Sequence, residues 1–345
     1  MKKLTALNEK LFDAVQAGDF ELAKQLVAQG ADVNACDEDD ATPLHIAAGV
    51  EKDNCEVIKL LVDNSADLEV KNFDNETPLL KAASDGNLQN VKCLIELGAD
   101  VCPTENGPTI LHCAALVGNL SLVKYIIYEQ KLDISYNVGI LGTPLHCAAI
   151  SGNLKVVRFL LEQCNADMFA RTKGRGLLPI HYASYSHGGH LDIVKYFIQK
   201  GVDKDVEDSL GMTPFLFAAD EGNLELVQYF FGQGANVSVC TKDSKMGALA
   251  LAVKGSMQWE EERQDRLALV KYLVETVGLD CEQKNIMGWT PLFWAIRNGS
   301  FAVVKYLIEK CSVDITVRDI ESKTVFDLEF DQKQQEIIDY LKNRL

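Results

Sequence analysis

The chain has 345 residues, a hydrophobic content of 47% and a formal net charge of −16 at pH 7. This hydrophobic content excludes a disordered chain, because enough apolar surface is present to offset the entropy lost on folding. The negative charge argues against nucleic acid and anionic membranes as partners, since their phosphates would be repelled. No apolar run approaches the roughly 18 residues that a bilayer-spanning helix needs. Residues 1–9 also lack the apolar region of a cleaved secretory signal.

A motif built around Thr-Pro-Leu-His recurs along the chain, most clearly at 42–45 and 143–146. Its second position, or the equivalent residue of a variant, falls at 43, 78, 110, 144, 179, 214, 248, 291 and 325. Successive copies are therefore 32 to 35 residues apart, with one longer step of 43 residues. A fixed period of about 33 residues indicates a stack of small units that share one structure.

The unit at 139–172 shows what one repeat is expected to form. Thr143 can cap a first helix, and Pro144 suits its first turn, where a missing N–H costs nothing. Gly152 tolerates a left-handed backbone and is expected to end this helix. Apolar residues at helical spacing in 154–161 then predict a second, antiparallel helix. Two such short helices cannot bury their apolar faces alone, so each unit needs its neighbours for stability.

This pattern resembles the ankyrin repeat. Its parts are Gly-x-Thr-Pro-Leu-His-x-Ala-Ala, then Gly-x-Leu-x-x-Val-x-x-Leu-Leu, and a tail that reads Gly-Ala-Asp-Val-Asn at 30–34. The resemblance covers essentially the whole chain and implies an all-α repeat fold, an ankyrin-repeat solenoid of helix-turn-helix units with short β-hairpin loops. We predict a single array at 1–345. It begins with an N-terminal cap repeat at 1–36 and ends with a C-terminal cap at 319–345. The eight units between them are 37–71, 72–103, 104–137, 138–172, 173–207, 208–241, 242–284, which carries an inter-helix insertion, and 285–318.

Six histidines are candidates for catalysis or metal binding. His187 and His190 lie where two extra residues lengthen the turn between two helices. A metal pair is one explanation, but only Asp192 lies near as a further ligand, so we expect an ordinary turn residue and a helix start. The resemblance implies a structural role for the other four, which would hydrogen-bond to the backbone of the neighbouring hairpin: His45, His112, His146 and His181.

Ten cysteines raise the question of disulfides. Cys113 and Cys147 occupy the same slot in adjacent units, and stacked helices lie about 8–10 Å apart. That spacing exceeds the roughly 7 Å between Cα atoms that a disulfide allows. No Cys-x-x-Cys pair supports a zinc site. We therefore expect reduced, mostly buried thiols in a cytosolic protein.

Sequence motifs of common enzymes are missing from the chain. It contains no Gly-x-x-x-x-Gly-Lys-Ser/Thr loop, no Gly-x-Ser-x-Gly elbow and no His-Glu-x-x-His pair. We therefore expect no catalytic residue, no cofactor and no metal, and we predict that the chain is not an enzyme. An enzyme with a site grafted on the array is the alternative.

In the implied architecture, hairpin tips and the inner helices line one concave face, where the motif leaves positions free to vary. The early units present mainly carboxylates there, among them 37–40, which form either a solvated hairpin tip or a contact for a basic partner. Later units present apolar and aromatic residues, which is typical of an interaction surface, although single residues could instead pack against the next hairpin. The predicted protein-binding residues are Phe73, Leu116, Val117, Ile140, Ile150, Arg175, Tyr185, Leu210, Met212, Asp220, Glu221, Met287, Trp289 and Arg297.

The step of 43 residues places an insertion at 254–266, between the two helices of one unit. Insertions in repeat arrays map to loops, often on a functional face. Trp259, which stands among many charged residues, is expected to be either a lid over the second helix or an exposed anchor.

We predict a non-enzymatic interaction module or scaffold that binds a protein partner through the concave face, without nucleic acid or membrane. A preorganised solenoid loses little entropy on binding. The chain is expected to be a cytoplasmic monomer. The alternative is a secreted effector of an intracellular bacterium that engages a host protein in the host cytoplasm, because the Gly-Asn-Leu-x-x-Val style of the units resembles arrays common in such bacteria.

Overall fold

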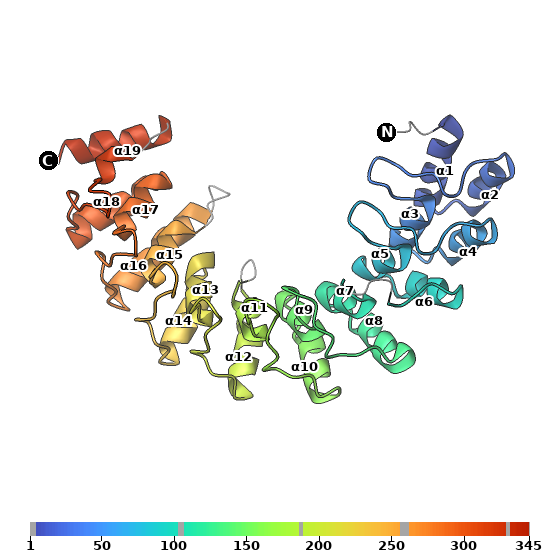
Figure 1. Ribbon diagram of the computed structural model, residues 1–345, viewed down its shortest axis with the longest axis horizontal. Coiled ribbons are helices and arrows are strands. Elements are labelled where there is room, and N and C mark those ends of the chain that lie inside the picture. Colours follow the sequence, from blue (N-terminus) through green and yellow to red (C-terminus); the bar gives the residue numbers. More distant parts are fainter. Residues whose placement is uncertain (1–4, 103–106, 186–188, 256–261, 329–331, 345) are drawn as a thin grey trace. The chain divides into compact units, whose positions relative to one another are not determined.

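The computed structural model describes residues 5–344 apart from 103–106, 186–188, 256–261 and 329–331. The chain divides into two compact units, Met1–Gly174 and Arg175–Leu345. Throughout the described residues the regular elements are helices, which follow one another in pairs along each unit (Figure 1). The expected β-hairpins are reduced to tight turns, with isolated antiparallel bridges at Val138–Gly142 and Cys240–Gly247.

In the first unit, each repeat contributes a first or inner helix and a second or outer helix. Each inner helix packs against the inner helices of its neighbours and against its own outer helix. The inner helices are α1 (Ala6–Ala17), α3 (Pro43–Gly49), α5 (Pro78–Ser84), α7 (Ile110–Val117) and α9 (Pro144–Ile150). The outer helices are α2 (Phe20–Ala28), α4 (Cys55–Asp63), α6 (Leu88–Glu96), α8 (Leu120–Tyr125), which continues as the π-helical η1 (Ile126–Gln130), and α10 (Leu154–Glu162).

The second unit repeats this pairing. Its inner helices are α11 (Pro179–Tyr185), α13 (Pro214–Glu221), α15 (Ala248–Lys254) and α17 (Pro291–Arg297). Its outer helices are α12 (Leu191–Gln199), α14 (Leu224–Gly232), α16 (Glu262–Glu275) and α18 (Phe301–Cys311). In the last repeat, the 3₁₀-helix η2 (Val325–Asp327) takes the place of an inner helix, and α19 (Gln332–Lys342) packs against α17.

The inner helices begin and end where the motif predicts. Pro78 occupies the first turn of α5, and the Thr77 hydroxyl accepts a hydrogen bond from the backbone N–H of Leu80 at 3.3 Å. This bond satisfies one of the amides that a helix start leaves free. Helix α7 ends at Gly118, whose φ of 74° lies in the left-handed region that glycine adopts without strain.

Asparagines at the start of the outer helices also connect neighbouring repeats. The side-chain carbonyl of Asn119 accepts the N–H of Leu122 at 3.1 Å, and its amide donates to the carbonyl of Gly86 at 2.7 Å. In the next repeat, the amide of Asn153 donates to the carbonyl of Gly118 at 2.6 Å. A single side chain therefore caps one helix and stabilises the contact with the repeat before it.

A disulfide between Cys55 and Cys93 contradicts the expectation that the cysteines are all reduced thiols. Cys55 opens α4 and Cys93 lies on α6, the outer helix of the next repeat. Their Cα atoms are 5.8 Å apart, because residues at the contact between two helices lie closer together than the helix axes do. Cys113 and Cys147 are buried free thiols, and the other six cysteines are free as well.

Candidate protein-binding site

Five-residue hairpin tips that share one hydrogen-bond pattern precede α3, α5, α13, α17 and η2. In the tip at 208–212, the N–H of Asp208 donates to the carbonyl of Met212 at 3.0 Å. Oδ1 of Asp208 accepts the N–H groups of Leu210 at 2.9 Å and of Met212 at 2.8 Å. The fourth residue, Gly211, has a φ of 76°. The same arrangement, with Asp or Asn in first position, forms the tips at 37–41, 72–76, 285–289 and 319–323.

Main-chain hydrogen bonds join neighbouring tips within each unit. The N–H of Phe73, the second residue of its tip, donates to the carbonyl of Asp39, the third residue of the preceding tip, at 2.8 Å. In the second unit the N–H of Lys242 donates to the carbonyl of Leu210 at 2.8 Å. The residues at the second and third positions of these tips are exposed. On the described tips of each unit, these side chains therefore form an exposed edge that does not take part in the main-chain bonds between the tips.

Four of the predicted binding residues lie on this edge. Phe73 and Ile140 are each 80% exposed, and Leu210 and Met287 are exposed as well. Large apolar side chains are usually buried, so their exposure at equivalent positions is typical of an interaction surface. These four side chains are therefore accessible to solvent, and their contact with a partner stays a prediction.

Two predicted residues are buried, and the expectation that they are exposed was wrong. Met212 and Trp289 are only 5% and 6% exposed. Both hold the fifth tip position, directly before the residue that caps the next inner helix. The Trp289 ring stacks on Phe293 with centroids 5.5 Å apart, and its Nε1–H donates to Oδ2 of Asp319 at 3.2 Å. Trp289 therefore joins two repeats internally and is not available to a partner.

The ends of the inner helices provide the second part of the candidate surface. Leu116 and Val117 are exposed at the end of α7, whereas Ile150 at the end of α9 is half-buried. Tyr185, the last residue of α11, is 49% exposed. Its ring meets Phe217 edge-on with centroids 5.7 Å apart, which is a favoured aromatic geometry.

Arg175 is held by contacts inside the second unit. Its Nε lies 2.7 Å from Oδ2 of Asp208, whose side chain is fully buried. Its guanidinium carbon lies 5.2 Å from the centroid of the Phe217 ring. A buried carboxylate is costly without a cation beside it. Arg175 therefore supports the tip at 208–212 by balancing the charge of the carboxylate that organises it.

A charged and aromatic cluster lies near the ends of α13, α15 and α17. The guanidinium of Arg297, which is exposed, lies 5.4 Å from the ring centroid of Trp289 and 5.8 Å from that of Trp294. Lys254 Nζ lies 5.8 Å from the Trp294 ring. Burial raises the pKa of the Asp220 carboxyl, and nearby positive charges, Lys254 first, act in the opposite direction. The predicted residue Glu221 is half-buried beside Asp220.

Sequence reasoning missed two aromatic residues that support this surface: the half-buried Trp294, and Phe217, which is buried at 3% exposure against the ring of Tyr185. Both occupy the slot between the His position and the Ala pair of the motif, a slot that the prediction did not consider. In the first unit the same slot holds Ile46 and Lys81, which line a cavity. Comparing that one slot between repeats would have revealed all four residues.

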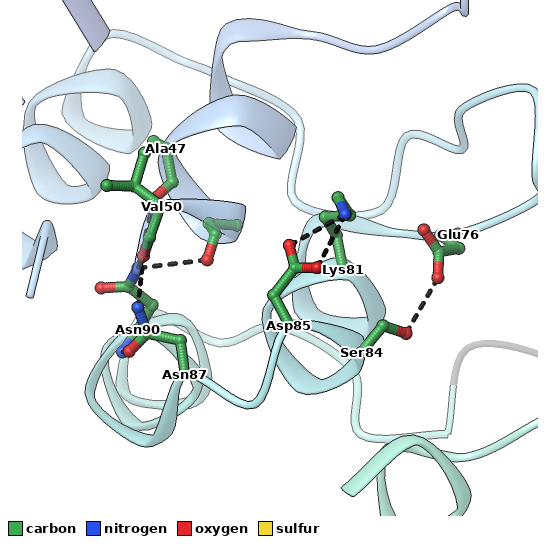
Figure 2. A network of polar contacts seen from close by, with 9 residues as sticks. Ala47, Val50, Glu76, Lys81, Ser84, Asp85, Asn87 and Asn90 are labelled. Carbon is green, nitrogen blue, oxygen red and sulfur yellow. Dashed lines mark hydrogen bonds and ion pairs between the residues drawn. The ribbon is translucent and has the colours of Figure 1, made fainter. Parts of the chain in front are cut away.

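In the first unit, an apolar cavity of about 240 Å³ opens beside the inner helices α1, α3 and α5. Figure 2 shows how the chain beside it is fixed: the amide of the buried Asn90 donates to the carbonyls of Ala47 at 3.2 Å and Val50 at 3.3 Å. On α5, Lys81 forms an ion pair with Asp85 at 2.8 Å. The cavity wall includes Gln16, Ala41, Ile46, Val50, Asn72 and Lys81.

The four motif histidines bind the start of their own helices, since each Nδ1 accepts a backbone N–H from three residues before it. Nε2–H of His45 donates to the carbonyl of Glu76 in the next repeat at 3.0 Å, and that of His112 to the carbonyl of Tyr136 at 3.1 Å. An accepting Nδ1 and a donating Nε2 require the neutral ring. Burial lowers the pKa of His45 and His112, although the backbone carbonyls favour the charged form. The geometry confirms the structural role of the histidines.

In the part of the chain that the structure describes, no three His, Cys, Asp or Glu side chains are placed to hold a metal ion. The backbone N–H of His190, at the start of α12, donates to the carbonyl of Ala183 at 2.9 Å. His187 and Trp259 lie outside the described residues. None of the described helices combines the length and hydropathy that a membrane span requires.

Paired short helices, hairpin tips and helix-capping histidines together define a helical repeat protein. The family model described as "Ankyrin repeats (3 copies)" matches overlapping segments that span most of the chain, at 11–105, 49–139, 101–172, 145–241, 180–259 and 215–319. The chain therefore belongs to the ankyrin-repeat family, whose arrays are protein-interaction modules.

Proteins with similar segments include three of very different overall organisation. The mouse "Ankyrin repeat and SAM domain-containing protein 6" is 37% identical over 71 residues, which are 20% of this chain and 8% of that protein. ZDHHC13 of Danio rerio, named as a candidate palmitoyltransferase, is 31% identical over 144 residues, which are 41% and 22% of the two chains. Alpha-latrotoxin-Lh1a of Latrodectus hasselti is 27% identical over 192 residues, 48% and 14% of the two chains. The chain thus matches only a minor part of each relative's length.

Proposed function

We propose that the chain is a non-enzymatic protein-binding module that engages its partner through the inner face of its units. The inner face comprises the second and third residues of the hairpin tips and the last residues of the inner helices. One observation carries this proposal: of twelve large apolar side chains that are exposed among the described residues, nine belong to this face. The nine are Phe73, Leu116, Val117, Ile140, Tyr185, Leu210, Ile286, Met287 and Ile320.

A protein is the partner class that suits this chemistry. Apolar and aromatic side chains that are exposed in a row and flanked by charge form the centre of many protein interfaces. Nucleic acids and anionic lipids are disfavoured by the net charge of −16. The similarity to ZDHHC13 covers only 22% of that protein. It therefore does not assign a palmitoyltransferase activity to this chain.

We further propose that the chain acts as a monomer in the cytoplasm. Eight of its ten cysteines are free thiols, which is typical of a reducing compartment. The pair Cys55–Cys93 would be reduced or oxidised there according to the redox potential of its surroundings.

The proposal is tested by affinity capture from the cell of origin with three baits. The first is the wild-type chain. The second carries Phe73→Ser, Ile140→Ser and Tyr185→Ser on the inner face. The third is a matched control whose exposed apolar residues lie elsewhere, with Leu22→Ser, Tyr128→Ser and Phe169→Ser.

We expect quantitative mass spectrometry to identify proteins that the wild-type and control baits retain and the inner-face bait loses. Thermal melting of the three purified baits establishes that each is folded. Retention of the same proteins by the inner-face bait, or their loss from the control bait alone, would contradict the proposal.

A further inference from the structure

Negative charge is concentrated at one end of the sequence. The first hundred residues contain twenty acidic and nine basic residues, which gives them a net charge of −11. The whole chain has a net charge of −16. Within these residues, the tips at 37–41 and 72–76 together hold six carboxylates, and the only basic residue next to them in the sequence is Lys71. Lys81, in the wall of the adjoining cavity, is paired with Asp85 at 2.8 Å. Such a local surplus attracts cations over about the Debye length, roughly 8–10 Å at physiological salt.

Four of the six tip carboxylates, those of Glu38, Asp39, Asp40 and Asp74, serve no internal purpose that the structure shows. Asp37 accepts the N–H groups of its own tip, and Glu76 accepts the hydroxyl of Ser84 at 2.9 Å (Figure 2). By contrast, Glu38, Asp39 and Asp74 hold the exposed second and third positions of their tips. Their charges can therefore face a partner without disturbing the fold.

The apolar cavity of the first unit adjoins these two tips. Its wall includes Ala41, the last residue of the first tip, and Asn72, the first residue of the second. The two tips are joined by the hydrogen bond from Phe73 to Asp39. A volume of about 240 Å³ is below the range of roughly 300–1,000 Å³ typical of small-molecule sites. It suits a single apolar side chain.

We propose that this site binds a basic segment of a partner protein, in which Arg or Lys residues flank one apolar residue. The apolar residue enters the cavity against Ile46 and Val50, and the cations meet Glu38, Asp39 and Asp74. The ring of Phe73, which is 80% exposed beside them, offers a face on which a guanidinium can stack. A second copy of this chain is disfavoured as the occupant, because it would bring the same surplus of negative charge.

The experiment selects peptides from a displayed library of random segments of about twelve residues on the immobilised full-length chain at about 0.1 M salt. We expect the selected sequences to be enriched in Arg and Lys around one Leu, Ile, Phe or Trp. Affinities of a selected peptide are then measured by fluorescence anisotropy against three variants of the chain. The tip variant carries Glu38→Gln, Asp39→Asn and Asp74→Asn, and the charge control carries Glu56→Gln, Asp63→Asn and Glu96→Gln on the outer helices.

The tip variant should bind the peptide about tenfold more weakly, whereas the charge control should bind it nearly as well as the wild type. The third variant, Ile46→Phe, fills the cavity. Replacing the apolar peptide residue by Gly should weaken wild-type binding about tenfold and should have little further effect on Ile46→Phe. Circular dichroism melts establish that each variant is folded.

Three results would overturn the inference: no enrichment of basic sequences, equal losses in the tip variant and the charge control, or equal binding of the apolar and Gly peptides. The inference rests on the proposed function, but the two can fail separately. If capture of the native partner depends on the inner face and is unchanged in the tip variant, only the basic segment is refuted. If capture is unaffected by the inner-face substitutions, the proposed function itself fails.

Discussion

The indole of Trp289 donates a hydrogen bond from Nε1 to Oδ2 of Asp319, the first residue of the next hairpin tip, at 3.2 Å. Oδ1 of the same carboxylate accepts the backbone N–H groups of Glu321 and Lys323, each at 2.9 Å. Trp289 closes one tip with its own backbone and contacts the residue that organises the next. The largest aromatic residue of the predicted binding set is therefore a connector between repeats.

Trp289→Ala should destabilise the second unit strongly. The ring is 6% exposed and stacks on Phe293, so its removal should lower the free energy of unfolding by roughly 3–5 kcal/mol. Trp289→Phe keeps most of the buried area and loses the hydrogen bond, and we expect a smaller loss. Urea unfolding followed by circular dichroism measures both. Equal stability of wild type and Trp289→Ala would show that the side chain is not packed as described.

Reduction of Cys55–Cys93 should destabilise the first unit. The bond closes a loop with a sequence separation of 38 residues, for which the loop-entropy relation gives roughly 3–4 kcal/mol. A reducing agent should therefore lower the melting temperature of the oxidised wild type. It should leave the melting temperature of Cys55→Ser unchanged, and that variant is the control. A melting curve that is insensitive to the reductant in the wild type would contradict the prediction.

Asn90→Ala should destabilise the first unit by roughly 1–3 kcal/mol, since it removes the side-chain donor to the carbonyl of Ala48 and the acceptor for the backbone N–H of the buried Asn54. Asn64 serves as the control, because its amide also donates to a carbonyl, that of Leu60 at 2.8 Å, but in an exposed position. Asn64→Ala should change stability by no more than about 0.5 kcal/mol. Chemical unfolding of both variants checks the difference, which should vanish if Asn90 is not buried as described.

Mild acid should weaken the fold through His45 and His112. Burial lowers the pKa of both rings below the ordinary value of 6.5, so the unfolded chain binds protons that the folded chain does not. Their contribution to stability is complete above pH 6.5 and is lost as the pH falls from there through the lowered pKa. Melting temperatures measured between pH 8 and pH 5.5 should fall accordingly.

The double variant His45→Asn, His112→Asn provides the control for this pH effect. It should melt lower than the wild type at pH 8 and should depend less on pH in the same interval. Asp220, whose raised pKa acts with the opposite sign, is present in both proteins and cancels in the comparison. Parallel pH profiles of the two proteins would contradict the prediction, because they would show that the pKa values of these histidines are the same in the folded and unfolded chains.

Helices and capping residues were predictable because they follow local rules. Thr77, Pro78 and Gly118 fix the start and end of a helix by hydrogen bonds and backbone angles within a few residues. The repeat period then supplies the neighbours of each helix, so the inner and outer rows follow from the motif. Contacts that span two repeats, such as Cys55 with Cys93, depend on which side chains meet at one point, and the motif does not specify these.

The candidate surface was predictable only in part, because exposure changes within a single tip. Phe73 and Leu210 hold outward positions, and their exposure followed from the motif. Met212 lies two residues after Leu210 and is buried, since the chain turns there into the cap of the next helix. The sequence pattern predicted the same exposure for the residues on both sides of the turn glycine. The left-handed fourth residue, Gly211 in this tip, makes them different.

The hydrogen bond that joins the second residue of one tip to the third residue of the preceding tip involves only main-chain atoms, as in the pair Phe73 and Asp39. A substitution at either position alters the surface of the protein but leaves the hydrogen bond in place. Evolution can therefore diversify these side chains with little effect on folding, one tip at a time. The same property makes the tips suitable for engineering, since a randomised library at the second and third positions would retain the framework that presents it.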